Sequence, residues 1–382
     1  MDFSAVPMVI FDFITMKLLP FLVVLTLIVF IHELGHYLVA RWNKVKVDAF
    51  AVGFGPELFG FNDRNGTRWK FCAIPLGGYV KFFGDEDPSS KPDFDKLDSM
   101  TEDEREGAFE HKALWRKASV VAAGPIANFI LAIVIYTGLF VVYDDVRVAA
   151  VVGEVVAESP AEKAGFKPGD KIVELQGSEI TSFDQVAETT MLSSGEALNF
   201  VVLRGEERVA LTAFPKMTEQ TDRFGNSYKV AQVGIRAFSG PENVVVRQLG
   251  PVEAFLKALD RTWVVIKGTF NFLGELILGK QDAKELRGPV GIGQITSQVA
   301  TLGVAQLLSL AGVISISIGL LNLFPVPMLD GGHLVFYAIE AIRGRPMSPR
   351  AMEISFRFGL MLVLGLMIFA TTNDVSRLFG AG

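Results

Sequence analysis

The chain has 382 residues, of which 50% are hydrophobic, and a formal net charge of −6. This composition is too apolar for an ordinary soluble protein, and the chain is long enough for several membrane spans plus a folded domain. The weakly acidic balance gives no sign of a nucleic-acid partner, and the single cysteine, Cys72, excludes an internal disulfide.

Four largely uncharged runs predict membrane spans. The first lies within residues 1–41, and we interpret it as retained, because its start lacks the basic region of a signal peptide. The other three are residues 118–143, 302–330 and 354–373. We therefore expect a polytopic α-helical membrane protein with about four spans.

The first span ends in a histidine motif, His32-Glu33-Leu34-Gly35-His36. On a helix, His32 and His36 project from one face and can hold one metal ion, while Glu33 is placed to take a proton from an attacking water. Ionisable groups in a membrane helix cost roughly 2.5–3.5 kcal/mol on insertion scales and usually mark function. The motif therefore predicts a catalytic zinc site, which needs a third protein ligand.

The distribution of Lys and Arg residues predicts the orientation of the spans. Basic residues flank the loop 42–117 and lie between the third and fourth spans, so both loops are expected on the cytoplasmic side. The first and third spans then end at the same face, which makes Asp330 the expected third ligand. His333 is either a supporting group or a rival ligand.

The cytoplasmic loop is expected to contain a membrane-associated β-hairpin. Its strands are predicted at Thr67–Ile74 and Gly78–Phe83, on their aromatic and β-branched residues. An exposed strand edge would accept an unwound substrate as an added strand, so Gly78, Tyr79 and Val80 are predicted to bind substrate. The alternative is a hairpin that only packs beneath the spans.

Within the second span, Asn128 is expected either to bond toward the site or the substrate, or to join helices. Two further regions follow this span. Residues 148–215 alternate short strands and helices in a pattern similar to a PDZ domain, an α/β fold that binds an extended peptide or C-terminus. Steric gating is the alternative role. Residues 250–280 predict an extracytoplasmic amphipathic helix, lying on the outer leaflet or against the domain.

Taken together, these motifs cover nearly the whole chain and resemble the site-2 protease family of intramembrane zinc metalloproteases, in its bacterial regulator of sigma-E protease type. The resemblance is carried by the histidine motif, by Gly124-Pro125-x-x-Asn128, by Asn322-x-x-Pro325-x-Pro327, by Leu329-Asp330-Gly331 and by the 75–81 loop. That type carries tandem PDZ domains, whereas this chain has room for a single one.

The resemblance implies that His32, His36 and Asp330 bind Zn²⁺, that Glu33 is the general base, and that Asn322 positions substrate or stabilises an oxyanion. It implies single-span membrane proteins as substrates, such as a pre-trimmed anti-sigma factor or signal-peptide remnants. The setting would be the lipid of a bacterial inner membrane, with the active site toward the cytoplasm and the PDZ domain outside.

Two alternatives to this function remain at this point. A prenyl-protein-type membrane protease would share the histidine motif, but it would not be expected to pair it with Leu329-Asp330-Gly331 and a PDZ domain. A non-proteolytic membrane PDZ sensor or scaffold would tolerate the loss of Glu33, which is present.

Overall fold

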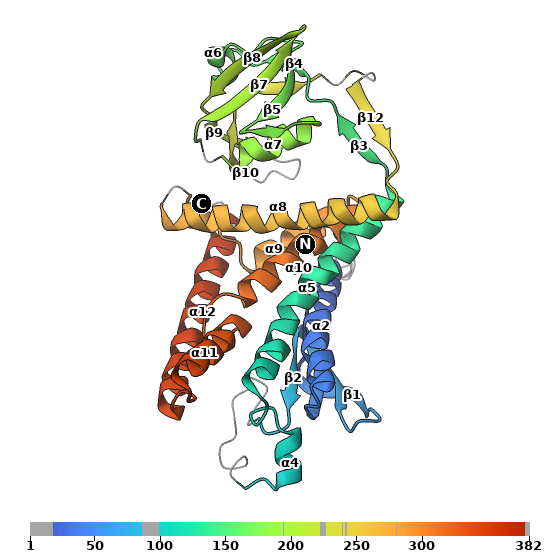
Figure 1. The fold of residues 1–382 in the computed structure, drawn as a ribbon, viewed down its shortest axis with the longest axis vertical. Coiled ribbons are helices and arrows are strands. Elements are labelled where there is room, and N and C mark those ends of the chain that lie inside the picture. Colours follow the sequence, from blue (N-terminus) through green and yellow to red (C-terminus); the bar gives the residue numbers. More distant parts are fainter. Residues whose placement is uncertain are drawn as a thin grey trace, which may run out of the picture. The chain divides into compact units, whose positions relative to one another are not determined.

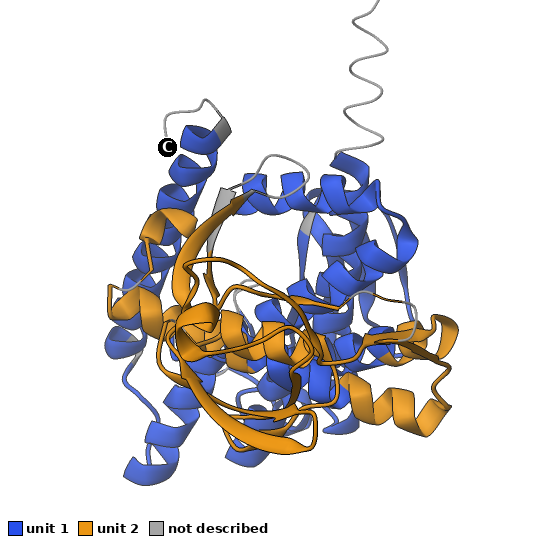
Figure 2. Cartoon of the chain, turned by 90° about the horizontal axis from the view of Figure 1, so that it is seen from above, with its two compact units in different colours: residues 1–136, 259–266, 286–382 blue, residues 137–258, 267–285 orange. Residues whose placement is uncertain are grey.

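The computed structural model describes residues 18–85, 99–193, 195–221, 227–238, 240, 243–279 and 281–378. Residues 1–17 of the predicted first segment and 86–98 of the predicted loop lie outside these ranges. Figure 1 shows the chain as a ribbon, and Figure 2 colours its two compact units. Unit 1 comprises residues 1–136, 259–266 and 286–382, and unit 2 comprises residues 137–258 and 267–285.

Among the described residues, four helices are long and apolar enough to cross a membrane. Each contains an 18-residue stretch with no more than two charged residues and a mean hydropathy of 2.0 to 2.2. A helix bonds its own backbone, so such segments can lie in lipid without unpaired polar groups. The helices are α2 (Leu19–Trp42), α5 (Leu114–Val142), α10 (Val304–Asn322) and α12 (Pro349–Leu378). The chain is therefore a multi-pass helical membrane protein.

The third span is shorter than the predicted range 302–330. α10 ends at Asn322, since Pro325 and Pro327 cannot continue a helix, and Asp330 begins a separate helix, α11 (Asp330–Arg343). Gly331 makes this turn possible, because a Cβ there would lie 2.3 Å from the carbonyl oxygen of Leu323. The ligand candidate thus stands at the start of a helix.

A short helix, α9 (Pro289–Ala300), precedes α10 and is held by α12. The buried carboxylate of Asp374 accepts hydrogen bonds from the backbone N–H groups of Gly288, at 3.2 Å, and Gly291, at 2.8 Å. These N–H groups stand at the start of α9, where a helix has no internal acceptors for them. Asp374 therefore ties the last span to α9.

The α2, α5 and α10 helices pack closely through small residues. A Cβ added to Gly35 of α2 would lie 2.4 Å from the Ala123 carbonyl oxygen of α5. A Cβ added to Gly319 of α10 would lie 3.0 Å from the Pro125 carbonyl oxygen. Small residues are what allow such close helix approach in membranes.

The β-hairpin is formed by segments that differ from the predicted pair. Its strands are β1 (Val47–Asn62) and β2 (Arg68–Phe82), followed by the short helix α4 (Glu102–Gly107). Both predicted strands fall in β2, except for Thr67 and Phe83 at their outer ends, and each pairs with β1 rather than with the other. Positive φ angles of 88° at Gly53 and 86° at Gly55 allow β1 to bend and present two pairing segments.

The register gives this β-sheet a definite order. Val52 pairs with Gly78 on one side and with Phe71 on the other. Across the sheet, the backbone segments therefore run in the order 78–82, 47–52, 68–71, 59–62. Among the described residues, the 78–82 segment has a strand neighbour on one side, and it is an edge strand.

Unit 2 contains a PDZ-like domain whose central sheet has the order β6-β5-β7-β8. Buried residues of this sheet, including Ile172, Phe200 and Val202, form the core with Val152 and Val186. The elements are β3 (Asp145–Val148), β4 (Val152–Val155), α6 (Pro160–Ala164), β5 (Lys171–Leu175), β6 (Ser178–Glu179), α7 (Phe183–Met191), β7 (Leu198–Arg204), β8 (Glu207–Ala213), β9 (Lys216–Thr221), β10 (Ser227–Gln232), β11 (Ile235–Ala237) and β12 (Val244–Arg247).

The domain extends beyond the predicted range 148–215. β11 pairs with β4, and β12 pairs with β3, so later residues complete its edges. The next helix, α8 (Pro251–Ile277), occupies the region predicted to be amphipathic, and the 3₁₀ turn η4 (Ala283–Glu285) follows.

Candidate metal centre

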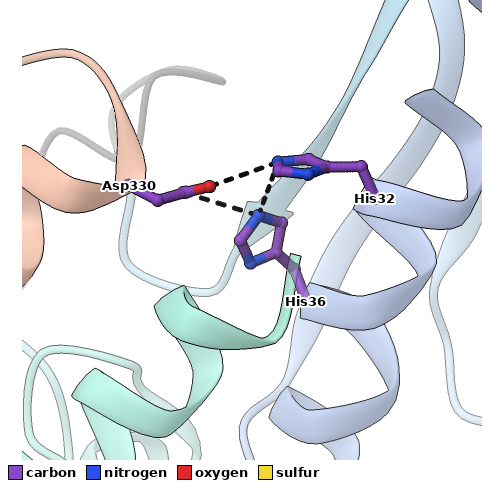
Figure 3. A group of neighbouring side chains, drawn as sticks. All are labelled: His32, His36 and Asp330. Carbon is purple, nitrogen blue, oxygen red and sulfur yellow. Dashed lines mark hydrogen bonds and ion pairs between the residues drawn. The ribbon is translucent and has the colours of Figure 1, made fainter. Parts of the chain in front are cut away.

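Three side chains from two distant parts of the sequence converge on one point within unit 1. His32 and His36 project from one face of α2, and Asp330 reaches them from the first residue of α11 (Figure 3). The two Nε2 atoms are 3.2 Å apart, and Asp330 Oδ2 and Oδ1 lie 3.2 Å from His32 Nε2 and 3.5 Å from His36 Nε2. Zinc bonds of about 2.0–2.1 Å in a tetrahedron place ligand atoms about 3.3 Å apart. The three predicted ligands are therefore spaced for one zinc ion.

The protonation pattern of His36 fits this use. Its Nδ1 lies 2.9 Å from the Val120 carbonyl oxygen, which can only accept, so Nδ1 donates its proton. The lone pair of Nε2 is then directed at the cluster. Asp330 Oδ2 is buried and has no hydrogen-bond donor among the described residues. A buried carboxylate oxygen without a donor is the kind of group that a cation would satisfy.

His32 is held by Asn128, a fully buried residue of α5. The Asn128 amide Nδ2 lies 3.2 Å from His32 Nδ1, while the amide oxygen is buried without a partner. If the Asn128 side-chain amide is rotated by 180°, its Oδ1 accepts a hydrogen bond from a protonated His32 Nδ1, and both of these atoms then have a partner. The lone pair of His32 Nε2 is then available to a metal ion. The contact favours the predicted bond toward the site over a direct substrate contact.

Gly124 provides the space for both imidazoles, a role that the sequence did not indicate. A Cβ at this position would lie 2.2 Å from His36 Nε2 and 2.9 Å from His32 Cε1. The backbone of α5 is therefore a wall of the site. A glycine in the middle of a membrane span, four residues before Asn128, was the available signal.

Glu33 lies between the cluster and the edge strand of the sheet. Its carboxylate is close enough to interact electrostatically with His32, His36 and Asp330, and it is in hydrogen-bonding reach of the Val80 backbone N–H. Gly78 leaves room for it, because a Cβ there would lie 3.3 Å from Glu33 Cγ. The Glu33 carboxylate and the strand edge thus share one location.

The other predicted site residues have different surroundings. Val80 has a buried side chain, which leaves only its backbone for substrate, and Tyr79 stacks on Phe54. Asn322 ends α10, and no hydrogen bond or ion pair joins it to the cluster among the described residues. His333 packs its ring against Phe356 on α12, so it is not in the three-residue cluster.

Comparisons with known proteins cover nearly the whole chain. A family model described as peptidase family M50 matches residues 20–366. The chain is 50% identical over 368 residues to "Putative zinc metalloprotease Atu1380" of Agrobacterium fabrum, which covers 96% of this chain and 98% of that protein. It is 37% identical over 382 residues to "Metalloprotease MmpA" of Caulobacter vibrioides, covering 94% and 95% of the two chains.

Solved structures also match part of the chain, and one of them is a PDZ domain. It is the PDZ domain of an SdrC-like protein from Listeria monocytogenes, at 18% identity, with 24% of this chain and 87% of that chain covered and a TM-score of 0.20.

Proposed function

This chain belongs to peptidase family M50, a family of zinc-dependent proteases, and we propose that it cleaves single-span membrane proteins within the bilayer. The observation that carries the proposal is the convergence of His32, His36 and Asp330, with ligand atoms within 4.8 Å of one another. His32 and His36 stand on a helix whose composition suits a membrane span. A hydrolytic centre built there would meet substrates that are themselves in the membrane.

Each residue has a distinct proposed role. His32, His36 and Asp330 hold the zinc ion, which when bound polarises a carbonyl group and eases the ionisation of water. Glu33 takes the proton of the attacking water and returns it to the amine that leaves when the peptide bond breaks. The Val80 N–H orients the Glu33 carboxylate until substrate arrives.

Substrate presentation is assigned to the 78–82 edge strand. The peptide bonds of a membrane helix are already hydrogen-bonded, and a protease must unwind them before attack. An edge strand offers replacement partners, so an unwound segment can add to it as a further strand. The assignment is supported by the register, which leaves one side of this strand, next to Glu33, without a strand partner among the described residues.

The PDZ-like domain is proposed to bind an extended peptide or C-terminus. Within unit 2, a cavity of about 390 Å³ lies between α7 and residues 231–236, and Val186 and Ile235 are among its lining residues. A groove between a helix and an extended segment is how strand addition is accommodated. The proposed substrates include a pre-trimmed anti-sigma factor or signal-peptide remnants, cut at the cytoplasmic side of a bacterial inner membrane.

The test compares wild type with Glu33→Gln on a tagged single-span substrate that lacks its outer domain. Bound zinc is quantified in both proteins, and His36→Ala is included as a variant that should lose zinc. Cleavage by wild type alone, with zinc retained in Glu33→Gln, is expected. Equal cleavage by both would overturn the mechanism and favour the non-proteolytic sensor or scaffold.

A further inference from the structure

Basic and aromatic side chains gather around an open cavity at the end of unit 1 where α2 finishes and α5 begins. The cavity has a volume of about 750 Å³. Its lining includes the cations Lys44, Arg105, Lys112 and Arg116 and the indoles of Trp42 and Trp115. The cavity is separate from the cluster of His32, His36 and Asp330, called here the zinc-type cluster, and has no part in the reaction described above.

The lining also contains one acidic residue, Glu106, so the four cations outnumber the acids around the cavity. No ion pair joins Lys44, Arg105, Lys112 or Arg116 to an acidic side chain among the described residues. The Lys112 ammonium instead donates to the backbone carbonyl oxygen of Glu106 at 2.5 Å. Burial, together with the like charges of Arg116 and Lys44, outweighs the opposite charge of Glu106 and lowers the pKa of Lys112. An anion bound here would relieve this repulsion.

Arg116 supplies a second, independent observation. Its Nε atom is buried and has no hydrogen-bond partner among the described residues, although its guanidinium lies 5.2 Å from the Trp115 ring centre. A buried guanidinium N–H without an acceptor costs free energy unless a ligand supplies one. Phosphate oxygens suit it, because a guanidinium presents a fork of donors that matches them.

The two indoles indicate where that phosphate comes from. Trp42 is the last residue of α2 and 85% exposed, and Trp115 is the second residue of α5 and 65% exposed. Exposed tryptophans at the ends of membrane spans lie at the headgroup level of a bilayer. Basic residues beside span ends are attracted to the anionic lipids of the cytoplasmic leaflet.

We propose that this cavity binds the headgroup of an anionic phospholipid, with the phosphate between Lys112 and Arg116 and the acyl chains along the exposed indoles. Both sides of the cavity belong to helices that build the zinc-type cluster, since α2 carries His32 and His36 and α5 carries Gly124 and Asn128. A bound lipid would therefore bridge the ends of these two helices.

The test uses the full chain in detergent and native mass spectrometry, with phosphatidylglycerol and phosphatidylcholine titrated separately. Wild type should bind phosphatidylglycerol more tightly. Lys112→Gln combined with Arg116→Gln should weaken that binding by roughly 10- to 30-fold, since each cation near a membrane surface contributes about 1 kcal/mol. Arg343→Gln combined with Arg345→Gln removes the same charge at the end of α11 and should leave the preference unchanged.

The controls separate the outcomes. Lys44→Gln combined with Lys112→Gln provides a second test if the first pair does not fold, as judged by bound zinc and thermal unfolding. An unchanged preference in a folded cavity variant, or an equal loss in the Arg343 and Arg345 control, would overturn the site. Displacement of the lipid by excess inorganic phosphate would show that the cavity takes free phosphate and would overturn the lipid assignment.

Discussion

The α-carbon of Gly124 lies directly against the imidazole of His36, and a Cβ built on it would come within 2.2 Å of Nε2. The atom that approaches the α5 backbone is the same atom that faces Asp330. Helix packing and ligand geometry are therefore set by one contact. A change in the distance between α2 and α5 would displace both histidines.

Gly124→Ala is expected to abolish zinc binding and cleavage, because the methyl group would occupy the position of the His36 ring. We expect zinc affinity to fall by more than about 100-fold, beyond the loss typical of residues that only support a ligand. Metal content and cleavage of a single-span substrate measure the effect. Gly138→Ala, in the same helix with nothing within 4 Å of its added Cβ, should keep both.

Asn128→Leu should weaken zinc binding by roughly 10–100-fold, since His32 would lose the group that holds its Nδ1–H. Asn128→Asp keeps an oxygen acceptor and should restore most of the affinity. Competition with a zinc chelator measures both variants. Equal losses in the two would assign Asn128 to helix packing and contradict the proposed hydrogen bond.

The edge-strand proposal can be tested with disulfide cross-links, because Cys72 is the one native cysteine. In a Cys72→Ser background carrying Glu33→Gln, Tyr79→Cys should cross-link to cysteines near the cleavage site of a bound substrate. Phe59→Cys lies on the opposite edge of the same sheet and should not. Cross-links at Phe59 alone would place the substrate on the wrong edge for this mechanism.

Asp374→Ala should destabilise unit 1 by about 3 kcal/mol, because two backbone N–H groups at the start of α9 would lose a charged acceptor. Thermal unfolding in detergent measures the change. Gly291→Ala should also destabilise, since its Cβ would lie 2.4 Å from Asp374 Oδ1. Gly365→Ala, whose Cβ meets nothing within 4 Å, is the control and should leave stability unchanged or higher.

The PDZ-like domain should lose stability in acid through Asp170. Burial opposes ionisation of this carboxyl, but two hydrogen bonds from Arg204, each 2.8 Å, and one from the Lys167 N–H outweigh it and lower the pKa. A lowered folded-state pKa stabilises the fold above the unfolded value of about 3.9, and this stabilisation is lost as the pH falls through the folded value.

The measurement for this prediction is hydrogen exchange in β5 and β7 of the full chain. At pH 7, Arg204→Gln should reduce protection by about 2 kcal/mol, the contribution of a charged hydrogen-bonded pair. As the pH falls through the folded-state pKa of Asp170, the difference from wild type should shrink, because the carboxyl becomes protonated in both proteins. A difference that stays constant with pH would assign the effect of Arg204 to packing.

Local sequence patterns were sufficient for the four spans and for the alternating strands and helices of residues 148–215, but not for the strands that lie beyond that range. Ser159 and Gly165 flank α6 at the two positions expected for a helix cap, with φ at Gly165 of 87°. The apolar runs of α2 and α5 predict helices because a bilayer admits few other structures. The spacing of His32 and His36 likewise follows from a single helix.

The strand pairing of the β-hairpin was harder to predict from the sequence. The predicted strand 78–83 does form, but its partner is β1 and not the predicted strand 67–74. Pairing is decided by which segments meet in space, and two positive-φ glycines in β1 alter that choice. The edge position of 78–82 follows from this register.

The sequence predicts the candidate ligand types, the helix that carries two of them and, through the topology of the spans, the position of Asp330. The tertiary structure decided how those groups are held: Gly124 against the His36 ring, Asn128 behind His32, and Asp330 on the first residue of α11. Helical periodicity is local and can be read from neighbouring residues. The space between two helices depends on every side chain in their interface, and only the folded chain specifies it.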